Sequence, residues 1–461
     1  MINILRQPAG FYRNVFALMI PIVLQNLITQ TVALTDTFMV GILGEEYLAA
    51  VTIAQTPLFI FMIFTFGVQS GAGILVSQYW GKGNLTAINR VLGVGVYFAA
   101  GITLAGAMLV TSFPHQILGL VTTETELVAL GAQYARIVCF AMVLNSVSLT
   151  YLSCQRNMEN PKLGVIVLSI SSVFSIFMNW VLIFGNLGFP ALGIQGAAIS
   201  TLCARALEVA IISTHAFRNK RFRIKLRLLL KPGIIILKDF LKYSLPVLLN
   251  DSLWGFGAML FPVIIGHMPG AGTNLAAYNI SGNLERLFAV TMFACGGSTA
   301  VIIGREIGAG RRDRVQSIAK SLITLGFLLG LCSGAMLMLA RLTILEPFVF
   351  PLFDLSQEAA STATIMLTFV AISLPLRTLG FTMGIGILRG GGDVKTLMMI
   401  DIGALYLISL PMASTTGLIL GLGIAVVYSS FLVEDSVKVT LLILRVRSQK
   451  WIHDVTRDKI E

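Results

Sequence analysis

The stretch RNKRFRIKLRLLLKPGIIILKDF, residues 218–240, is the longest polar stretch of the chain and separates two segments that resemble each other. Four short matches occur in the same order on both sides of it: IPIVLQN (20–26) with LPVLLND (245–251), LAAV (48–51) with LAAY (275–278), WGKGN (80–84) with IGAGR (307–311), and RNMENPK (156–162) with RGGGDVK (389–395). Their offsets along the chain are nearly constant. The pattern therefore indicates an internal duplication joined by a basic segment.

The composition places both copies in a membrane. Of 461 residues, 56% are hydrophobic and only 12% are charged, and the mean hydropathy is +0.85, whereas about a quarter of the residues of a soluble protein are charged. Apolar spans of about twenty residues divide the chain into about twelve spans, about six in each copy. An even number keeps the copies in the same orientation. We therefore predict an all-α integral membrane protein with two six-helix lobes related by a pseudo-two-fold axis along the membrane normal.

The loops between the predicted spans alternate in charge, and this alternation predicts the topology. One set carries Lys and Arg, and the other carries Glu and Asp with Arg341 as its only base. Because cytoplasmic loops are enriched in Lys and Arg, we place the protein in the cell membrane with both termini in the cytoplasm. The predicted parts are an N-terminal lobe (1–217), a basic cytoplasmic linker (218–239), a C-terminal lobe (240–445) and a cytoplasmic tail (446–461).

Several classes of function find no support in the sequence. The net charge of +11 follows from the loop topology and does not indicate a nucleic-acid partner. The Cys and His residues lack metal-ligand spacing, and no Walker A pattern occurs, which argues against a metal centre and ATP hydrolysis. Without Asp-rich or His-rich clusters near a bilayer face, a membrane-embedded enzyme is a remote alternative. We predict no enzymatic activity and no cofactor apart from a coupling ion.

A charged group inside a predicted span costs at least about 2.5–3.5 kcal/mol and is a functional candidate by default, and three aspartates in spans are considered first. Asp36 lies toward the outer end of the first span, and Asp251 lies near the middle of the seventh. Neither has a base within one helical turn, so these two are the best candidates for binding a cation or a proton. Asp401 lies close to the cytoplasmic boundary, where it could meet Arg389 or Lys395.

The duplication does not extend to these carboxylates. Asp251 has Asn26 as its counterpart, while Asp36 falls opposite an apolar residue, which predicts different tasks for the two lobes. Other ionisable residues inside spans have neighbours of opposite charge and are expected to pair structurally: Arg205 with Glu208, Glu285 with Arg286, and Glu434 and Asp435 with Lys438. Asparagines in spans often only bridge helices, so they are lesser candidates: Asn145, Asn179 and Asn279.

With these residues identified, the sequence resembles the multidrug and toxic compound extrusion (MATE) family of secondary transporters. The matching stretches cover both lobes: ALTDTFMVG (33–41), SQYWGKGN (77–84), MNWVLIFGNLGFPALGIQGAA (178–198), SLPVLLNDSLWGFG (244–257), GREIGAG (304–310), ILRGGGDVKT (387–396), EDSVK (434–438) and RVRSQKW (445–451). The resemblance implies two six-helix bundles that form a V around a central cleft. It also implies the export of organic, usually cationic, compounds in exchange for entering Na⁺ or H⁺.

The resemblance assigns roles to individual residues. The first-span acid implicated in ion coupling corresponds to Asp36, which would be the Na⁺ ligand in a Na⁺-coupled protein, and the fifth-span asparagine corresponds to Asn179. An Asn-Glu pair before a tryptophan in the seventh span corresponds to Asn250, Asp251 and Trp254, with Asp in place of Glu. Some members carry a further Asp where this chain has Ile183, so the choice between Na⁺ and H⁺ stays open.

We therefore hypothesise an antiporter that works by alternating access, with Asp36 and Asn179 as the ion-coupling residues. Its expected partners are small organic cations, Na⁺ or H⁺, and the lipid bilayer. The residues predicted to line the substrate and ion cleft are Gln25, Asn26, Asn250, Asp251, Trp254, Asn279 and Asp401. A lipid-linked sugar flippase of the same superfamily is the alternative, although it would want a more basic central cavity for pyrophosphate.

Overall fold

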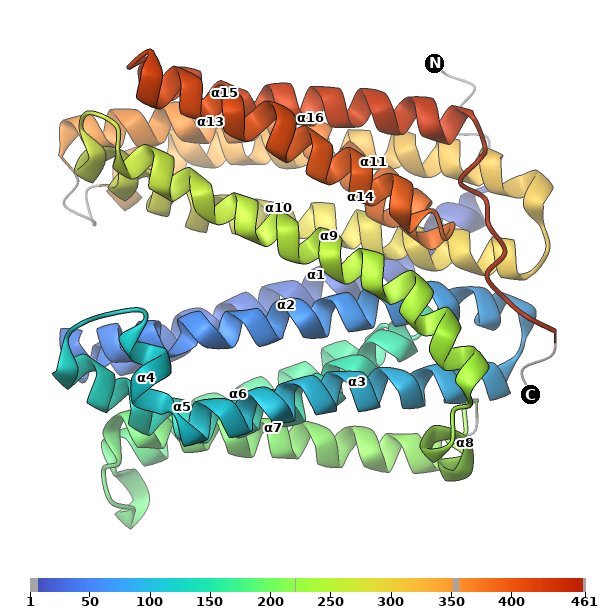
Figure 1. Ribbon diagram of the computed structural model, residues 1–461, viewed down its shortest axis with the longest axis horizontal. Helices are drawn as coiled ribbons and strands as arrows, with labels where there is room; N and C mark the ends of the chain where they lie inside the picture. The colour runs from blue at the N-terminus through green and yellow to red at the C-terminus, as the bar shows by residue number, and fades with distance from the viewer. Residues whose placement is uncertain (1–6, 220, 351–355, 459–461) are drawn as a thin grey trace. The chain divides into compact units, whose positions relative to one another are not determined.

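The computed structural model describes residues 7–219, 221–350 and 356–458, and all regular elements in this part of the chain are helices (Figure 1). The ends of the predicted N-terminal lobe and tail, and one linker residue, lie outside the described residues. Eleven described helices are long and apolar enough to cross a membrane. A further long helix, α16 (Ile424–Arg447), carries Glu434, Asp435 and Lys438 near its middle. These helices confirm the predicted all-α membrane class with about twelve spans.

The first half of the chain forms these helices: α1 (Ala9–Gly41), α2 (Glu45–Lys82), α3 (Leu85–Ser112), α4 (Pro114–Gly119), α5 (Thr125–Asn157), α6 (Lys162–Phe184), the 3₁₀ helix η2 (Asn186–Gly188) and α7 (Gly193–Arg218). A short helix, α8 (Leu226–Leu230), follows in the basic segment. Local sequence explains where the long helices stop and start. Gly83 ends α2 with φ at 74°, a conformation that favours glycine. The Asn84 side chain then caps α3 by accepting a hydrogen bond from the Ala87 N–H at 3.0 Å.

The second half forms these helices: α9 (Ile234–Gly266), α10 (Ala271–Gly308), α11 (Arg312–Ala340), η3 (Arg341–Val349), α13 (Gln357–Phe381), η4 (Thr382–Arg389), α14 (Val394–Ala404), η5 (Leu405–Ser409), α15 (Leu410–Ser414), η6 (Thr415–Ile419) and α16. The segments η3 to η6 are π-helical and continue the helices that precede them. As a result, α13 with η4 forms one apolar span, and α14 to η6 forms another.

The chain divides into two compact units. The C-unit comprises residues 1–23 and 249–455, and the N-unit comprises residues 24–248 and 456–461. The boundaries fall inside α1 and α9, the first helices of the two copies. Each helix carries a proline shortly before its boundary, Pro21 in α1 and Pro246 in α9, and proline removes a hydrogen bond from a helix interior.

Packing explains why each of these two helices has one part in the C-unit and the other part in the N-unit. In the C-unit, Val15 and Leu18 of α1 belong to a buried apolar cluster with Val301 and Ile302 of α10. In the N-unit, the first half of α9 packs against α2 at Gly71. A β-carbon at Gly71 would lie 2.5 Å from the Ser244 Cα, so only glycine allows this approach.

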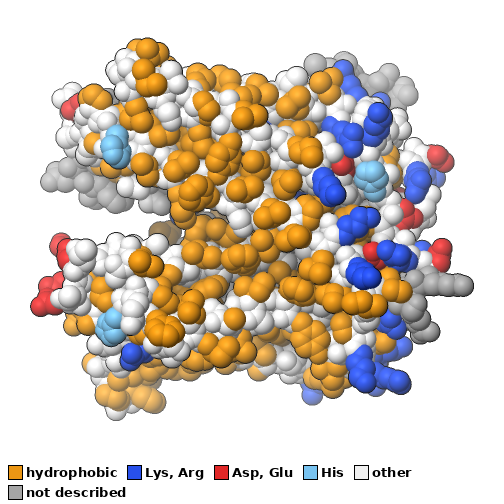
Figure 2. All heavy atoms as spheres, viewed as in Figure 1, with side chains coloured by type: hydrophobic (Ala, Val, Ile, Leu, Met, Phe, Trp, Pro, Cys, Tyr) orange, Lys and Arg blue, Asp and Glu red, His pale blue; other side chains and the backbone are white. Residues whose placement is uncertain are grey.

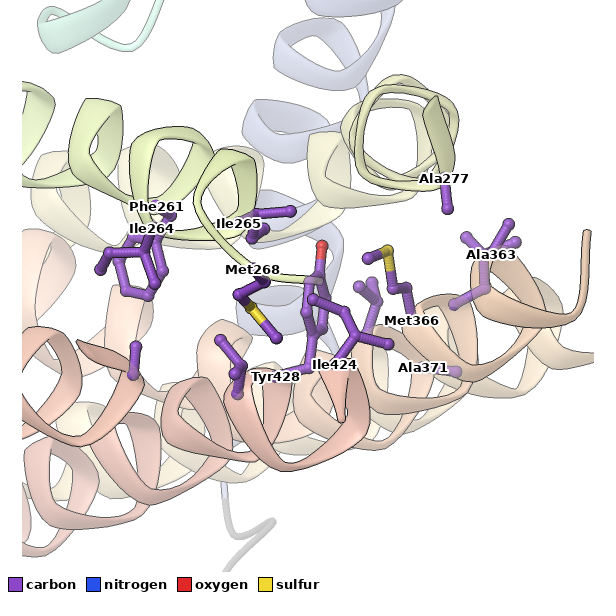
Figure 3. Close-up of a cluster of buried hydrophobic side chains, with 14 of the residues drawn as sticks. Phe261, Ile264, Ile265, Met268, Ala277, Ala363, Met366, Ala371, Ile424 and Tyr428 are labelled. Carbon is purple, nitrogen blue, oxygen red and sulfur yellow. The ribbon is translucent and has the colours of Figure 1, made fainter. Parts of the chain in front are cut away.

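The C-unit core is an apolar cluster drawn from several helices (Figure 3). Phe261 and Met268 of α9, Met366 of α13 and Tyr428 of α16 are all buried in it. The rings of Phe261 and Phe431 lie 4.2 Å apart. Methionine suits such a cluster because its flexible side chain fills irregular gaps. The cluster fixes α9 and α16, which carry the acidic residues discussed below.

Charged side chains gather at the helix ends. On the face shown in Figure 2, hydrophobic side chains cover the middle of the helices and Lys and Arg gather at one end. In the N-unit, Lys82 lies in the last turn of α2 and Glu45 in its first turn. In the C-unit, Arg305 lies in the last turn of α10, and Glu358 lies in the first turn of α13. The apolar middle and charged ends are those of a membrane-spanning bundle.

The tail after α16 is anchored in both units by its own residues. In the C-unit, Trp451 is fully buried, and its Nε1 donates a hydrogen bond to the Val446 carbonyl at 3.1 Å. In the N-unit, the Arg457 guanidinium binds the buried Asp239 carboxylate at 2.6 and 2.7 Å. The described part of the tail is therefore packed structure.

Candidate functional site

Asp36 on α1 and Asn179 on α6 meet inside the N-unit. The Asn179 Nδ2 donates a hydrogen bond to Asp36 Oδ1 at 2.6 Å. Asn179 is 1% exposed, whereas Asp36 is half-buried. The Asn179 Oδ1 is buried and has no hydrogen-bond partner in the described part of the chain. The structure thus brings the two predicted ion-coupling residues together and leaves an acceptor oxygen beside the carboxylate.

A polar stripe on α6 places Asn179. Ser171, Ser175 and Asn179 recur every four residues, so they lie on one face of the helix, and all three are buried. This face meets α7, because the Ser200 hydroxyl donates to the Ser175 carbonyl at 2.9 Å. The Ser171 hydroxyl donates to Glu208 Oε1 at 2.7 Å. The stripe therefore fixes the rotation of α6 that points Asn179 at Asp36.

Asp36 forms no ion pair with any described base. The guanidinium of Arg205 on α7 is bound by the fully buried Glu208, three residues along the same helix, as the spacing predicts. The acceptors beside Asp36 are its own carboxylate and the Asn179 Oδ1. Oxygen donors of this kind suit a proton or a hard cation.

The acids of the C-unit have basic partners. Arg389 is 3% exposed, and its Nη2 lies 2.9 Å from Asp251 Oδ1. The Asn250 Nδ2 lies 3.2 Å from Asp251 Oδ1 and 3.5 Å from Asp401 Oδ2. The Lys438 Nζ lies 3.4 Å from Asp401 Oδ1 and 3.2 Å from Glu434 Oε1. Charged and amide groups from four helical segments thus form one connected chain inside this unit.

A second, partly buried base of the C-unit also binds two acids. Arg377 on α13 binds Glu285 on α10, and its Nε lies 2.9 Å from Asp435 Oδ2 on α16. Sequence spacing suggested Arg286 as the partner of Glu285. The spacing of Glu434 and Lys438, four residues apart on α16, predicted their contact. Asp401 was expected to meet Arg389 or Lys395, but its base is Lys438, and Arg389 binds Asp251. The partners of Arg377 and Arg389 come from other helices, so no periodicity in the sequence marks these pairs.

The remaining residues that were predicted to line the cleft are Gln25, Asn26, Trp254 and Asn279. The Gln25 Nε2 donates to the Pro161 carbonyl at 2.6 Å, which ties α1 to the start of α6. Asn26 is half-buried in the N-unit. Trp254 is 48% exposed and Asn279 is exposed, and neither forms a hydrogen bond with these acids within the described residues. Asp251, Asn250 and Asp401 are therefore the predicted cleft residues that the structure brings together in the C-unit.

A duplicated bundle of apolar helices that encloses ionisable side chains is typical of membrane transporters. The MatE family model matches residues 21–181 and 246–415, one segment in each copy of the duplication. The chain therefore belongs to the MatE family, the multidrug and toxic compound extrusion transporters, as its motifs predicted. Members of this family are transporters, which confirms the prediction that the chain is not an enzyme.

Individual relatives agree with this membership. The chain is 26% identical to the probable multidrug resistance protein YoeA of Bacillus subtilis, over 87% of this chain and 86% of the relative. It is 20% identical to the probable multidrug resistance protein NorM of Thermotoga maritima, over 95% and 93%. Among solved structures, a MOP superfamily transporter from Pyrococcus furiosus superposes with a TM-score of 0.85 at 19% identity, over 97% of each chain. The binding pocket of that protein is described as having reverse polarity.

Proposed function

We propose that this transporter is an antiporter of the cell membrane, with both termini in the cytoplasm, that exports organic, mostly cationic compounds in exchange for entering Na⁺ or H⁺. The observation that supports this is the environment of Asp36. Its carboxylate is bound by a neutral amide, and no described base forms an ion pair with it. A carboxylate in such a place favours a cation from outside the protein.

The proposed mechanism is competition by charge. A vacant, ionised Asp36 attracts a cationic substrate strongly, because opposite charges interact strongly where water is scarce. An entering proton neutralises the carboxylate, whereas an entering Na⁺ would take the carboxylate and the Asn179 Oδ1 as ligands. Either event removes the attraction and releases the substrate. Alternating access would present the site to the two sides of the membrane in turn.

Transport in proteoliposomes tests this proposal. Ethidium efflux would be measured with a Na⁺ gradient and a proton gradient imposed separately, for the wild type and for Asp36→Asn. We expect one gradient to drive efflux and the substitution to lower this efflux about a hundredfold. The exposed acid Asp313 in the first turn of α11 provides a control of equal charge change, Asp313→Asn, which should transport normally. Unchanged efflux in Asp36→Asn, or translocation of a lipid-linked sugar without either gradient, would exclude the proposal.

A further inference from the structure

A polar cavity lies in the N-unit, lined by residues far along the chain from Asp36. It measures about 80 Å³ and is lined by residues that include Trp80, Gln155, His215, Asn219 and Arg221. These residues lie at or just beyond the ends of α2, α5 and α7, on the end of the unit that carries Lys and Arg. The volume exceeds the roughly 30 Å³ that one water occupies. The cavity therefore has room for a small polar group.

The turn after α7 builds one wall. The Asn219 Oδ1 accepts hydrogen bonds from the backbone N–H of Arg221 at 2.9 Å and of Phe222 at 3.3 Å. Phe222 is buried and anchors the turn. The Arg221 guanidinium lies 4.8 Å from the centre of the Trp80 ring, a contact that holds a cation over an aromatic face. The Arg221 charge is thus positioned by the fold.

A hydrogen bond orients the His215 ring. The Gln155 Nε2 donates to the Tyr151 hydroxyl at 3.0 Å, and this hydroxyl lies 2.9 Å from His215 Nδ1. The tautomer in which the Tyr151 hydroxyl donates to Nδ1 carries the imidazole proton on Nε2. In this tautomer, His215 offers an N–H donor on the ring nitrogen that does not face Tyr151.

Three hydrogen-bond donors at the cavity are not paired with an acceptor of the described protein. Within the described residues, the Arg221 guanidinium, the His215 Nε2 and the Asn219 Nδ2 have no hydrogen-bond or ion-pair partner. No Asp or Glu is among the lining residues. The carboxylate of Glu159 is directed at Trp80, with its Oε2 3.4 Å from Trp80 Nε1. An excess of donors that includes a guanidinium is the arrangement that binds an oxyanion.

The adjacent segment has the character of a membrane-surface element. Residues 218–231 contain no Asp or Glu and are rich in Arg and Lys. Leu226 and Leu230 at the two ends of α8 are each 54% exposed, and Ile234 at the start of α9 is 62% exposed. Exposed apolar side chains interspersed with bases are typical of segments that lie on a bilayer with anionic lipids.

We propose that this cavity binds a phosphate oxyanion, with Arg221, His215 and Asn219 as its donors. The group would be carried by the headgroup of an anionic phospholipid or would be a free phosphate ion. Binding would fix the turn after α7 against α2 and α5. The site is separate from Asp36 and would bind its ligand whichever ion drives transport.

Two binding measurements on the full-length protein test the site and show whether its phosphate group comes from a lipid headgroup or a free ion. Native mass spectrometry would count phosphatidylglycerol and phosphatidylcholine molecules retained by the protein, and calorimetry would follow titration with sodium phosphate at constant ionic strength. Arg221→Gln should weaken binding at least tenfold, and His215→Gln should weaken it less. Arg223→Gln removes the same charge from the same segment at a residue that does not line the cavity, so it should bind as the wild type does.

The outcomes are distinct. Preferential retention of phosphatidylglycerol that is lost in Arg221→Gln identifies a lipid headgroup site. Binding of inorganic phosphate that is lost in the same variant, without any lipid preference, identifies a free-ion site. Equal losses in Arg221→Gln and Arg223→Gln would show nonspecific attraction to a basic segment and overturn the proposal. Absence of binding for both probes would also overturn it.

Discussion

Asp36 in the N-unit and Asp251 in the C-unit are carboxylates inside membrane helices, and each accepts a hydrogen bond from an asparagine whose Oδ1 is buried without a partner among the described residues. They differ in their charged neighbours. Asp251 is bound by the buried Arg389, whereas Asp36 has no base at ion-pair distance among the described residues. A carboxylate neutralised by the protein's own base needs no further cation, while one held only by an amide does. The comparison therefore supports the proposal that Asp36 in the N-unit couples transport to an ion and that Asp251 in the C-unit has a structural role.

The largest expected effect is on the stability of the C-unit. Replacing Arg389 with Gln leaves the Asp251 carboxylate without this base, and breaking a buried ion pair in this way costs about 3–5 kcal/mol. Thermal unfolding in detergent should show a clearly lowered midpoint. The double variant Arg389→Gln with Asp251→Asn should recover most of the loss, because no unpaired charge remains. A fully stable single variant would contradict the structural role of this pair.

The next effect is on transport and concerns Asp36. Asp36→Asn keeps the shape of the side chain and a hydrogen-bond acceptor for Asn179 but removes the negative charge. We expect gradient-driven efflux to fall about a hundredfold, equivalent to about 2.7 kcal/mol in the transport barrier. The unfolding midpoint should stay close to that of the wild type, because no ion pair is broken. A strong loss of stability without a transport-specific effect would remove the contrast between the two acids.

The sequence predicted the parts of the molecule that depend on local pattern. Apolar spans predicted a helical membrane protein, short repeated matches predicted its duplication, and the spacing of Arg205 and Glu208 predicted their contact. Asp36 and Asn179 were each assigned to ion coupling through the resemblance of their motifs to a family. Their contact joins residues 143 positions apart. Local spacing alone shows only neighbours within a turn of the same helix.

The remaining features depend on tertiary packing. Arg389 lies 138 residues from Asp251, so nothing in the sequence around Asp251 marks it as paired. The division of the chain inside α1 and α9 is a second example. A continuous apolar helix has the same hydropathy whichever bundle it packs against, and its prolines alone do not identify the boundary. Both features follow from contacts that only the three-dimensional structure provides.

A smaller effect is expected at Asn179. Asn179→Ala removes the hydrogen bond to Asp36 and the unpartnered oxygen but leaves the carboxylate. Because hydrogen bonds to charged groups contribute about 1.5–3 kcal/mol, the ion concentration for half-maximal efflux should rise at least about tenfold. Asn145 on α5 is also half-buried, so Asn145→Ala is a matched control that should leave this concentration unchanged. Equal effects of the two substitutions would show that Asn179 acts only through helix packing.

The smallest effect is expected at Asp458, an acid that forms an ion pair with a base on the exposed surface. Asp458 is 92% exposed, and its Oδ1 lies 2.7 Å from Lys82 Nζ. Lys82 lowers the pKa of the Asp458 carboxyl below its usual 3.8, so any contribution of the pair to stability is present above that pH and disappears as the pH falls further. Because water and salt screen exposed pairs, Asp458→Asn should leave the unfolding midpoint unchanged at neutral pH. If it lowered the midpoint as much as Arg389→Gln, burial would not explain why the Asp251 pair matters, and the contrast with Asp36 would need another cause.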